Sequence, residues 1–342
     1  MRISLGMRDH FLDHSKALLI FLVVFGHFLE RLLGWGNSTS HLLLGIIYSM
    51  HMPAFIFISG MLYKDHNYLK NIIFFLSLYL PFQLLLPMID AGLQGHWQFY
   101  FNWQNVFKRP YWILWYLMGM MVWTACTHAL IKYRGFACVL SISGALLVGC
   151  LTGNNYDYSI GRIVVFFPFF IVGYVYGQTL MQTVRQQSWA GYGALAGLLL
   201  IGVVVAVSQL SPYWLYGSVN YTQLQVSHVA GIGIRAGLML LSSVGIYSLL
   251  AMTRYLSPRW GSLGRYTLPV YLLHGLVVLL MVELMTALPA WQQMGIWLKF
   301  SIALLLSILS CWVLKQALFD RLLRFLSLWL MAPYAKMTRP KS

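Results

Sequence analysis

The sequence predicts an all-α, polytopic integral membrane protein with about ten transmembrane helices. Of its 342 residues, 59% are hydrophobic and only 9% are charged, whereas about 25% of the residues of a soluble domain carry a charge. So few charged residues cannot cover the surface of a soluble protein of this size. A soluble enzyme, a DNA-binding domain and a disordered tail are therefore excluded as descriptions of the whole chain.

Long apolar runs recur along the sequence, and a membrane helix needs about 20 mostly apolar residues. Ten runs are candidates: Ala17–Leu33, Leu42–Tyr63, Lys70–Ile89, Tyr111–Leu130, Phe136–Thr152, Ile163–Leu180, Trp189–Gln209, Ile232–Met252, Tyr266–Met285 and Ile296–Leu318. No segment outside them is long enough for a soluble domain. We therefore expect residues 1–342 to form a single membrane-embedded domain.

The net charge of +15 is distributed unevenly between the two sides of these spans. With ten spans, 17 of the 23 Lys and Arg residues fall on the side of the termini and 6 on the other side. Because basic residues favour the cytoplasmic side, both termini are predicted to be cytoplasmic. The charge thus reports orientation and does not indicate a nucleic-acid partner.

Three polar residues share one face of the first span. Asp13 and Lys16 are three residues apart, and Lys16 and His27 are eleven apart, which is close to three helical turns. The rise from Lys16 to His27 is about 16 Å, and from Asp13 about 21 Å. Ionisable groups are costly in a membrane. We therefore expect this polar stripe to face the protein interior, with His27 near mid-membrane.

The second span brings another histidine to a similar depth. His51 lies twelve residues before Tyr63, about 18 Å from the cytoplasmic end of an antiparallel neighbour. Pro53 lacks a backbone donor, so the carbonyl of Ser49 is predicted to need another partner or a cavity.

Further polar or aromatic candidates are His274 in the ninth span, Arg162 at the outer end of the sixth, and Trp115 in the fourth. Each has an ordinary alternative: an isolated histidine can simply hydrogen-bond between helices, and Arg162 can reach the membrane surface. Glu30, near a helix end, is expected to be solvated. The outer loops contain aromatic runs, at 95–100 and 213–216, which suit either an interfacial belt or stacking on sugar rings.

Five motifs resemble the acyltransferase-3 family of membrane acyltransferases, and its fucose 4-O-acetylase-like branch most closely. They are Asp13-x-x-Lys16 with Gly26-His27, His51-Met52-Pro53 through Ser59-Gly60, Leu114-Trp115-Tyr116-Leu117, Arg162 with Phe167-Pro168-Phe169-Phe170, and Leu263-Gly264-Arg265 with Tyr271-Leu272-Leu273-His274. The chain departs from the family in having Lys16 where many members have Arg. It also lacks a pair of arginines after the second span, where only Lys64 and Lys70 occur.

The resemblance implies a membrane-bound O-acyltransferase, an acetyl-CoA-dependent O-acetyltransferase above all. The acyl group would move from cytoplasmic acyl-CoA to a hydroxyl of a carbohydrate, either cell-surface or lipid-linked. The implied catalytic residues are His27, Asp13, His51 and His274, with His27 as general base or as transient acyl carrier. Lys16, Lys64 and Lys70 would bind CoA, and Arg162, Trp115, Tyr116 and Ser59 the acceptor.

Acyl-CoA would be a co-substrate, and neither a permanent cofactor nor a metal is expected. The rival interpretations are a transporter or flippase for a glycan or small polar solute, which midplane histidines and a proline kink also suit, and a non-catalytic scaffold. The sugar, the acyl chain length and the oligomeric state stay open.

Overall fold

The computed structural model describes residues 9–95, 108–152 and 156–337, and every regular element in these ranges is a helix. The long helices are α1 (His10–Leu33), α2 (Ser38–Leu62), α3 (Tyr68–Gln94), α5 (Trp115–Leu130), α6 (Arg134–Leu147), α7 (Ile160–Gln186), α8 (Ala190–Ser208), α10 (His228–Met252), α12 (Thr267–Thr286), α14 (Ile296–Leu314) and α15 (Ala317–Met337). The short ones include η3 (Trp112–Leu114), α9 (Pro212–Tyr216), η8 (Pro258–Trp260), α11 (Gly261–Arg265) and α13 (Pro289–Gln293). The all-α fold predicted from the sequence is confirmed.

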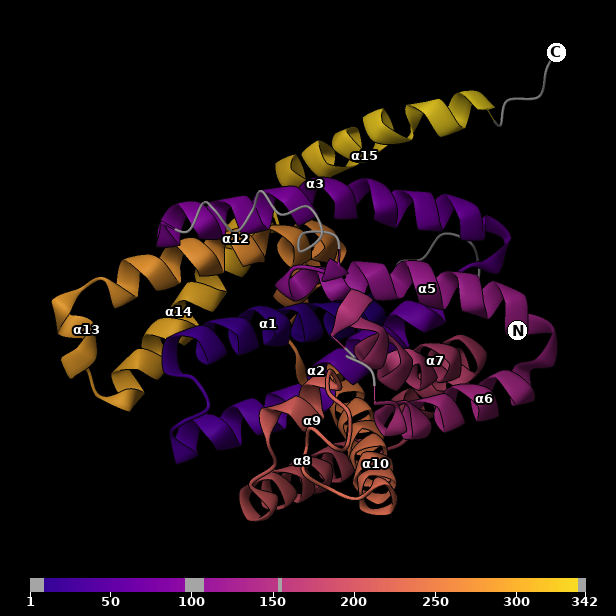
Figure 1. Ribbon diagram of the computed structural model, residues 1–342, viewed down its shortest axis with the longest axis horizontal. Coiled ribbons are helices and arrows are strands. Elements are labelled where there is room, and N and C mark those ends of the chain that lie inside the picture. Colours follow the sequence, from indigo (N-terminus) through magenta and orange to yellow (C-terminus); the bar gives the residue numbers. More distant parts are fainter. Residues whose placement is uncertain (1–8, 96–107, 153–155, 338–342) are drawn as a thin grey trace.

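Eight helical segments of the described chain are long and apolar enough to cross a membrane. One of them, Trp112–Cys150, contains both α5 and α6. Helix α1, predicted as the first span, is not among the eight; it carries four charged residues and lies in the middle of the bundle (Figure 1). The protein is therefore a polytopic membrane protein in which a helix with four charged residues lies inside the bundle.

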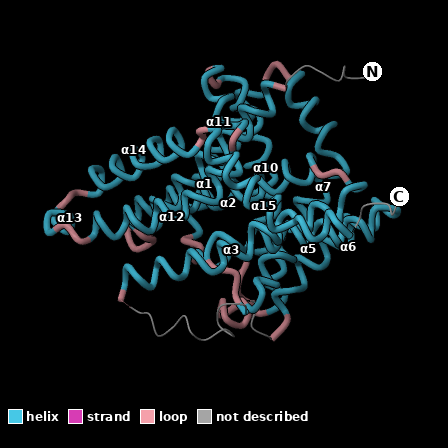
Figure 2. The backbone as a smooth tube through the Cα atoms, turned by 90° about the horizontal axis from the view of Figure 1, so that it is seen from above, coloured by secondary structure: helices cyan, strands magenta, loops and turns pink. Residues whose placement is uncertain are grey.

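The start of α1 and the end of α15 lie toward the same end of the molecule (Figures 1 and 2). We call this end the terminal face. The opposite end, where α1 ends at Leu33 and α2 begins at Ser38, is the far face. Helix α1 packs against α2, which follows it, and against α11, α12 and α14 from the last third of the chain. The polar stripe of α1 is thus surrounded by helices from the N-terminal and from the C-terminal parts of the chain.

Helices α2 and α7 cross with their backbones in direct contact. A Cβ atom added to Gly60 would lie 2.0 Å from the carbonyl oxygen of Phe170, and one added to Gly173 would lie 2.0 Å from that of Phe57. Only glycine fits at either position, as in other close crossings of membrane helices. This contact fixes α2, which carries His51, relative to α7, which carries Arg162.

The carbonyl oxygen of Ser49, which Pro53 leaves without a backbone donor, has a hydrogen-bond partner in a neighbouring helix. The Ser242 hydroxyl of α10 donates a hydrogen bond of 2.6 Å to the carbonyl oxygen of Ser49. This bond satisfies the carbonyl in the protein interior and ties α2 to α10.

The C-terminal part differs from the expectation. The last apolar run was predicted to reach Leu318, but α14 ends at Leu314 and a further helix, α15, follows. Asp320, Arg321 and Arg324 interrupt its apolar residues, so no run of 20 marks it in the sequence. A hydrogen bond of 2.7 Å between the hydroxyls of Ser77 and Ser327 joins α15 to α3.

Candidate active site

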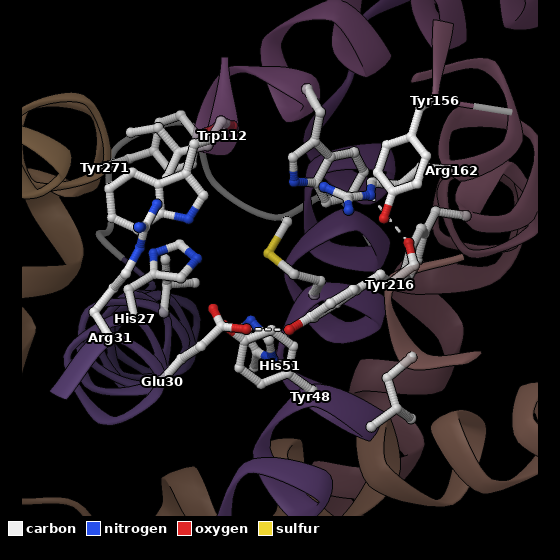
Figure 3. A pocket seen from close by; sticks show the side chains of 16 residues that line it. His27, Glu30, Arg31, Tyr48, His51, Trp112, Tyr156, Arg162, Tyr216 and Tyr271 are labelled. Carbon is white, nitrogen blue, oxygen red and sulfur yellow. Dashed lines mark hydrogen bonds between the residues drawn. The ribbon is translucent and has the colours of Figure 1, made fainter. Parts of the chain in front are cut away.

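A cavity of about 380 Å³ lies in the half of the bundle nearer the far face. Figure 3 shows the side chains that line it. We call it the upper cavity. Helices α1, α2, α7 and α12 contribute to its wall, together with η3 and α9. Its polar and aromatic lining residues are His27, Glu30, Arg31, Tyr48, His51, Trp112, Trp115, Tyr156, Arg162, Phe166, Tyr216 and Tyr271. The structure therefore gathers His27, His51, Arg162 and Trp115, four of the predicted site residues, around one space.

His27 and His274 form a hydrogen-bonded pair. The Nδ1 atom of His27 lies 2.8 Å from the Nε2 atom of His274, and the two rings are parallel with their centres 5.1 Å apart. His274 is fully buried behind His27. The sequence placed these residues in the interior but did not pair them.

The surroundings of His274 decide which nitrogen of His27 is available. The Nδ1 atom of His274 lies 2.6 Å from the carbonyl oxygen of Tyr271 and 3.1 Å from that of Val270. Carbonyl oxygens only accept, so this Nδ1 must carry a hydrogen. In a neutral His274 the Nε2 atom is then the acceptor, and His27 donates to it from Nδ1. The Nε2 atom of His27 is left with a lone pair, as a general base requires.

His51 lies in the same cavity but has a different partner. Its Nδ1 atom is 2.7 Å from the carbonyl oxygen of Ile47, one turn earlier in α2, and its ring meets that of Tyr48 edge to face. By the same reasoning His51 donates from Nδ1 and has Nε2 as an acceptor. The predicted similar depth of His27 and His51 is consistent with their sharing this cavity.

Glu30 was expected to be solvated at a helix end, but its side chain lines the upper cavity. Its carboxylate accepts hydrogen bonds from Trp35 Nε1 (3.0 Å), from the Tyr48 hydroxyl (2.5 Å) and from the Tyr216 hydroxyl. Figure 3 shows Glu30 and Tyr216 pointing toward each other. Burial raises the pKa of Tyr216 and the nearby Glu30 carboxylate raises it further, so the phenol stays protonated and donates.

Arg162 lies beside two aromatic rings of the same cavity. Its guanidinium carbon is 5.0 Å from the ring centre of Trp115 and 5.7 Å from that of Tyr216, and its Nε donates to the carbonyl oxygen of Tyr216 at 3.0 Å. The alternative, an Arg162 that extends to the membrane surface, is not what the structure has. Through Tyr216, Arg162 and Glu30 hold the end of α9 against the cavity.

Trp112 packs beside both histidines, and its ring centre lies 6.4 Å from that of His274. The ring centres of Trp112 and His27 are 4.9 Å apart, and the guanidinium carbon of Arg31 lies 4.6 Å from the Trp112 ring. Trp112 has a φ of +39°, a region that costs a non-glycine residue energy and that recurs at functional sites. The strained backbone thus places the Trp112 ring, tilted by 50°, against the candidate base.

A smaller cavity of about 130 Å³, the lower cavity, lies toward the terminal face. Lys16, Ser59 and Tyr116 line it, and Tyr271 lines both cavities. The Ser59 and Tyr116 hydroxyls are 2.7 Å apart, and the Tyr271 hydroxyl donates to the carbonyl oxygen of Ile113. The predicted acceptor residues are therefore divided: Arg162 and Trp115 line the upper cavity, and Tyr116 and Ser59 the lower.

The remaining predicted residues lie nearer the terminal face. Asp13 pairs with Lys16, the Nζ and Oδ1 atoms being 2.9 Å apart, and lines neither cavity. Lys64 and Lys70 are exposed at the turn between α2 and α3 and line neither cavity either. Within the described residues, no group of three or more His, Cys, Asp or Glu side chains could hold a metal ion.

Sequence reasoning missed Glu30, Trp112, Tyr48 and Tyr216 as cavity residues. For Glu30 a signal was present, because it follows His27 by one turn on the same helical face. Tyr216 belongs to the 213–216 aromatic run, for which sugar stacking was one interpretation. The 95–100 run lies outside the described residues except for Gly95.

Comparison with known proteins gives one family. The model of the acyltransferase domain Acyl_transf_3 matches residues 9–316, nearly the whole chain. No curated protein and no solved structure matches the chain. The matched range includes both cavities, the His27–His274 pair and α11–α12. The chain therefore belongs to the acyltransferase-3 family of membrane acyltransferases.

Proposed function

We propose that the protein transfers an acyl group, acetyl above all, from acyl-CoA to a hydroxyl of a carbohydrate. The observation that carries the proposal is His27, whose Nε2 lone pair is left free by His274 in a cavity lined by aromatic and charged side chains. The lower cavity ends at Tyr271, a residue that also lines the upper one. Donor and acceptor can thus approach one base from opposite faces.

The upper cavity suits a sugar. Aromatic faces of Trp112, Trp115 and Tyr216 offer apolar surfaces for the ring, as cavities for small ligands generally do. Glu30 accepts hydrogen bonds and Arg162 donates them, so both can orient hydroxyl groups. The volume of about 380 Å³ falls within the range of small-molecule sites. We infer an acceptor that presents one sugar unit at a time, either free or linked to a longer glycan or lipid.

In the proposed reaction His27 acts as general base. The acceptor oxygen attacks the thioester carbonyl carbon while its proton passes to Nε2 of His27. The carbon–sulfur bond then breaks, and the departing thiolate takes that proton back from Nε2. One ester forms and one thioester is lost. His274 accepts from Nδ1 throughout and stabilises the imidazolium, and His51 is a second hydrogen-bonding group at the cavity wall.

The orientation follows from the distribution of basic residues. With 17 of 23 Lys and Arg on the side of the termini, we propose that the terminal face is cytoplasmic and that the membrane is a bacterial inner membrane. Acyl-CoA is made in the cytoplasm and would reach the lower cavity from that side. The five motifs support the fucose 4-O-acetylase-like branch of the family.

The proposal is tested by measuring acetyl transfer in membranes that contain wild-type protein or His27→Ala. The variant is expected to lose transfer by about 10²–10⁴-fold while reaching the same level in the membrane. His228→Ala, an exposed histidine at the start of α10, is the matched control. Full activity of His27→Ala would overturn the proposal, and so would a solute flux driven by an ion gradient without any use of acetyl-CoA, since that is the behaviour of a transporter.

A further inference from the structure

A third cavity, of about 570 Å³, opens at the terminal face, and the proposed function does not yet use it. We call it the basic pocket. Its lining residues are His10, Pro258, Arg259, Gly261, Ser262, Arg265, Tyr266 and Lys315. Three of the eight are permanently basic and none is acidic. Such a concentration of positive charge in one concave surface favours a ligand with several negative charges.

The basic pocket is built by segments that are far apart in the sequence. Arg259 is in η8, Arg265 ends α11, and Lys315 follows α14, while His10 starts α1. Lys315 Nζ donates to the Ser262 hydroxyl at 3.0 Å. Gly264 seats α11 on α1, since a Cβ there would lie 1.8 Å from the carbonyl oxygen of Asp13. The pocket therefore has a fixed position relative to the base of α1.

The three cavities follow one another along α1. His10 lines the basic pocket, Lys16 the lower cavity and His27 the upper cavity. The rise from His10 to His27 is about 25 Å. On the opposite wall, Tyr266 lines the basic pocket and the next residue, Thr267, lines the lower cavity. Tyr271 then lines both the lower and the upper cavity.

The charge of the lining residues changes from the basic pocket to the lower cavity. The basic pocket is wide and cationic, whereas the lower cavity is narrow and lined mainly by uncharged side chains, with Lys16 its one charged group. Acyl-CoA changes in the same order, from a nucleotide bearing phosphates at its 3′ and 5′ positions to a slender uncharged arm that ends in the thioester. A cationic side chain binds a phosphate mainly through its charge.

We infer that the basic pocket binds the phosphorylated nucleotide of acyl-CoA, with Arg259, Arg265 and Lys315 contacting its phosphates. The inference rests on the proposed function, which supplies the acyl-CoA donor. It moves the nucleotide site away from Lys64 and Lys70, which line none of the three cavities. The uncharged arm then lies in the lower cavity past Lys16, and the thioester reaches the Tyr271 wall below His27.

The test uses the purified full-length protein in lipid nanodiscs and compares the double variant Arg259→Ala/Arg265→Ala with the wild type. The KM for acetyl-CoA is expected to rise about tenfold, since two phosphate contacts are lost, while kcat changes less than about twofold. CoA is expected to inhibit the wild type more strongly than 3′-dephospho-CoA, and the variant is expected to lose most of this difference. Raising the salt concentration should weaken acetyl-CoA binding more in the wild type than in the variant.

The matched control is Lys132→Ala/Arg134→Ala, which removes two positive charges from exposed positions outside the three cavities. Its KM for acetyl-CoA should stay at the wild-type value. An unchanged KM in Arg259→Ala/Arg265→Ala, or a tenfold rise in Lys64→Ala/Lys70→Ala alone, overturns the inference but leaves the acyltransferase proposal standing. A wild-type protein that neither binds CoA nor uses acetyl-CoA overturns both.

Discussion

Lys16 and His27 lie on the same face of α1 but in different cavities, and Tyr271 is the side chain that lines both. A polar stripe that reads as continuous in the sequence is thus divided in the structure. Lys16 of this stripe lies in the lower cavity and His27 in the upper cavity. Substitutions in the lower cavity and in the upper cavity can therefore measure the contribution of each cavity to activity separately.

The histidine pair predicts a strong dependence of activity on His274, although this residue does not line the upper cavity. In His274→Ala, nothing fixes the tautomer of His27, so kcat should fall about 10- to 100-fold with a smaller change in KM. Steady-state transfer assays on wild type, both single variants and the double variant would check this.

Because His274 acts only through His27, the variant His27→Ala/His274→Ala should be no less active than His27→Ala alone. Multiplication of the two losses in the double variant would show that His274 acts independently. His228→Ala again serves as the control.

The helical pattern predicts a similar level for His27 and His51, but it does not predict their partners. Spacing along α1 and α2 placed His27 and His51 at one level, and both line the upper cavity. Which histidine pairs with His27 depends on how α12 is rotated and packed against α1, 247 residues away. Because α12 is apolar on nearly all sides, the periodicity of its sequence does not indicate how the helix is rotated about its own axis.

Glu30 is a second residue whose partners cannot be predicted from the helical pattern. A carboxylate near a helix end is ordinarily solvated, and only the fold brings Tyr216, at the end of the distant short helix α9, to donate to it. Trp112 likewise reaches His27 through a local backbone conformation with positive φ that no sequence pattern announced. The fold class was predictable from composition and run length, whereas the upper cavity depends on loops and on contacts between distant helices.

Glu30→Gln should weaken the use of the acceptor more than that of acetyl-CoA. The glutamine side chain offers one acceptor oxygen where the carboxylate offered two, so one of the Tyr48 and Tyr216 hydroxyls loses its partner, at a cost of about 1–3 kcal/mol. We expect the KM for the acceptor to rise roughly tenfold, measured with acetyl-CoA saturating. Glu283→Gln, at an exposed site in α12, should change nothing; an equal effect of both variants would argue against the Glu30 contacts.

Tyr271 is predicted to narrow the junction between the two cavities by its ring rather than its hydroxyl. Tyr271→Ala should widen this junction and let water reach the thioester, so that acetyl-CoA hydrolysis without acceptor rises several-fold. Tyr271→Phe keeps the ring and should hydrolyse acetyl-CoA at the wild-type rate. The assay is release of free CoA in the absence of carbohydrate, and equal hydrolysis by the two variants would contradict the role of the ring.

The start of α1 should lose stability at acid pH. Burial raises the pKa of Asp9, but hydrogen bonds from Arg185 (2.6 Å) and the Leu12 N–H (3.1 Å), with the charge of Arg185, outweigh it and hold the pKa below 3.8. Because the folded-state pKa of Asp9 is lowered, its ionised carboxylate stabilises the folded state fully above the unfolded-state pKa, about 3.9. This stabilisation is lost as the pH falls through the folded-state pKa.

The thermal unfolding midpoint of Asp9→Asn should therefore lie below that of the wild type at pH 7, and the difference should shrink as the pH falls below about 4. Differential scanning fluorimetry in detergent across this range measures it. A difference that stays constant with pH would mean that Asp9 acts as an uncharged helix cap only.

The shared position of Tyr271 also has a consequence for the membrane as a barrier. The two cavities share Tyr271, so only a short thickness of protein separates them. If water fills both cavities, the membrane potential falls mainly across that wall. A potential of 100 mV is worth about 2.3 kcal/mol for each elementary charge that crosses. In the proposed reaction, the acceptor oxygen and the thioester carbon would meet at this wall, while ions and the CoA phosphates stay on their own side. An acyl group, which carries no net charge, crosses at no electrical cost.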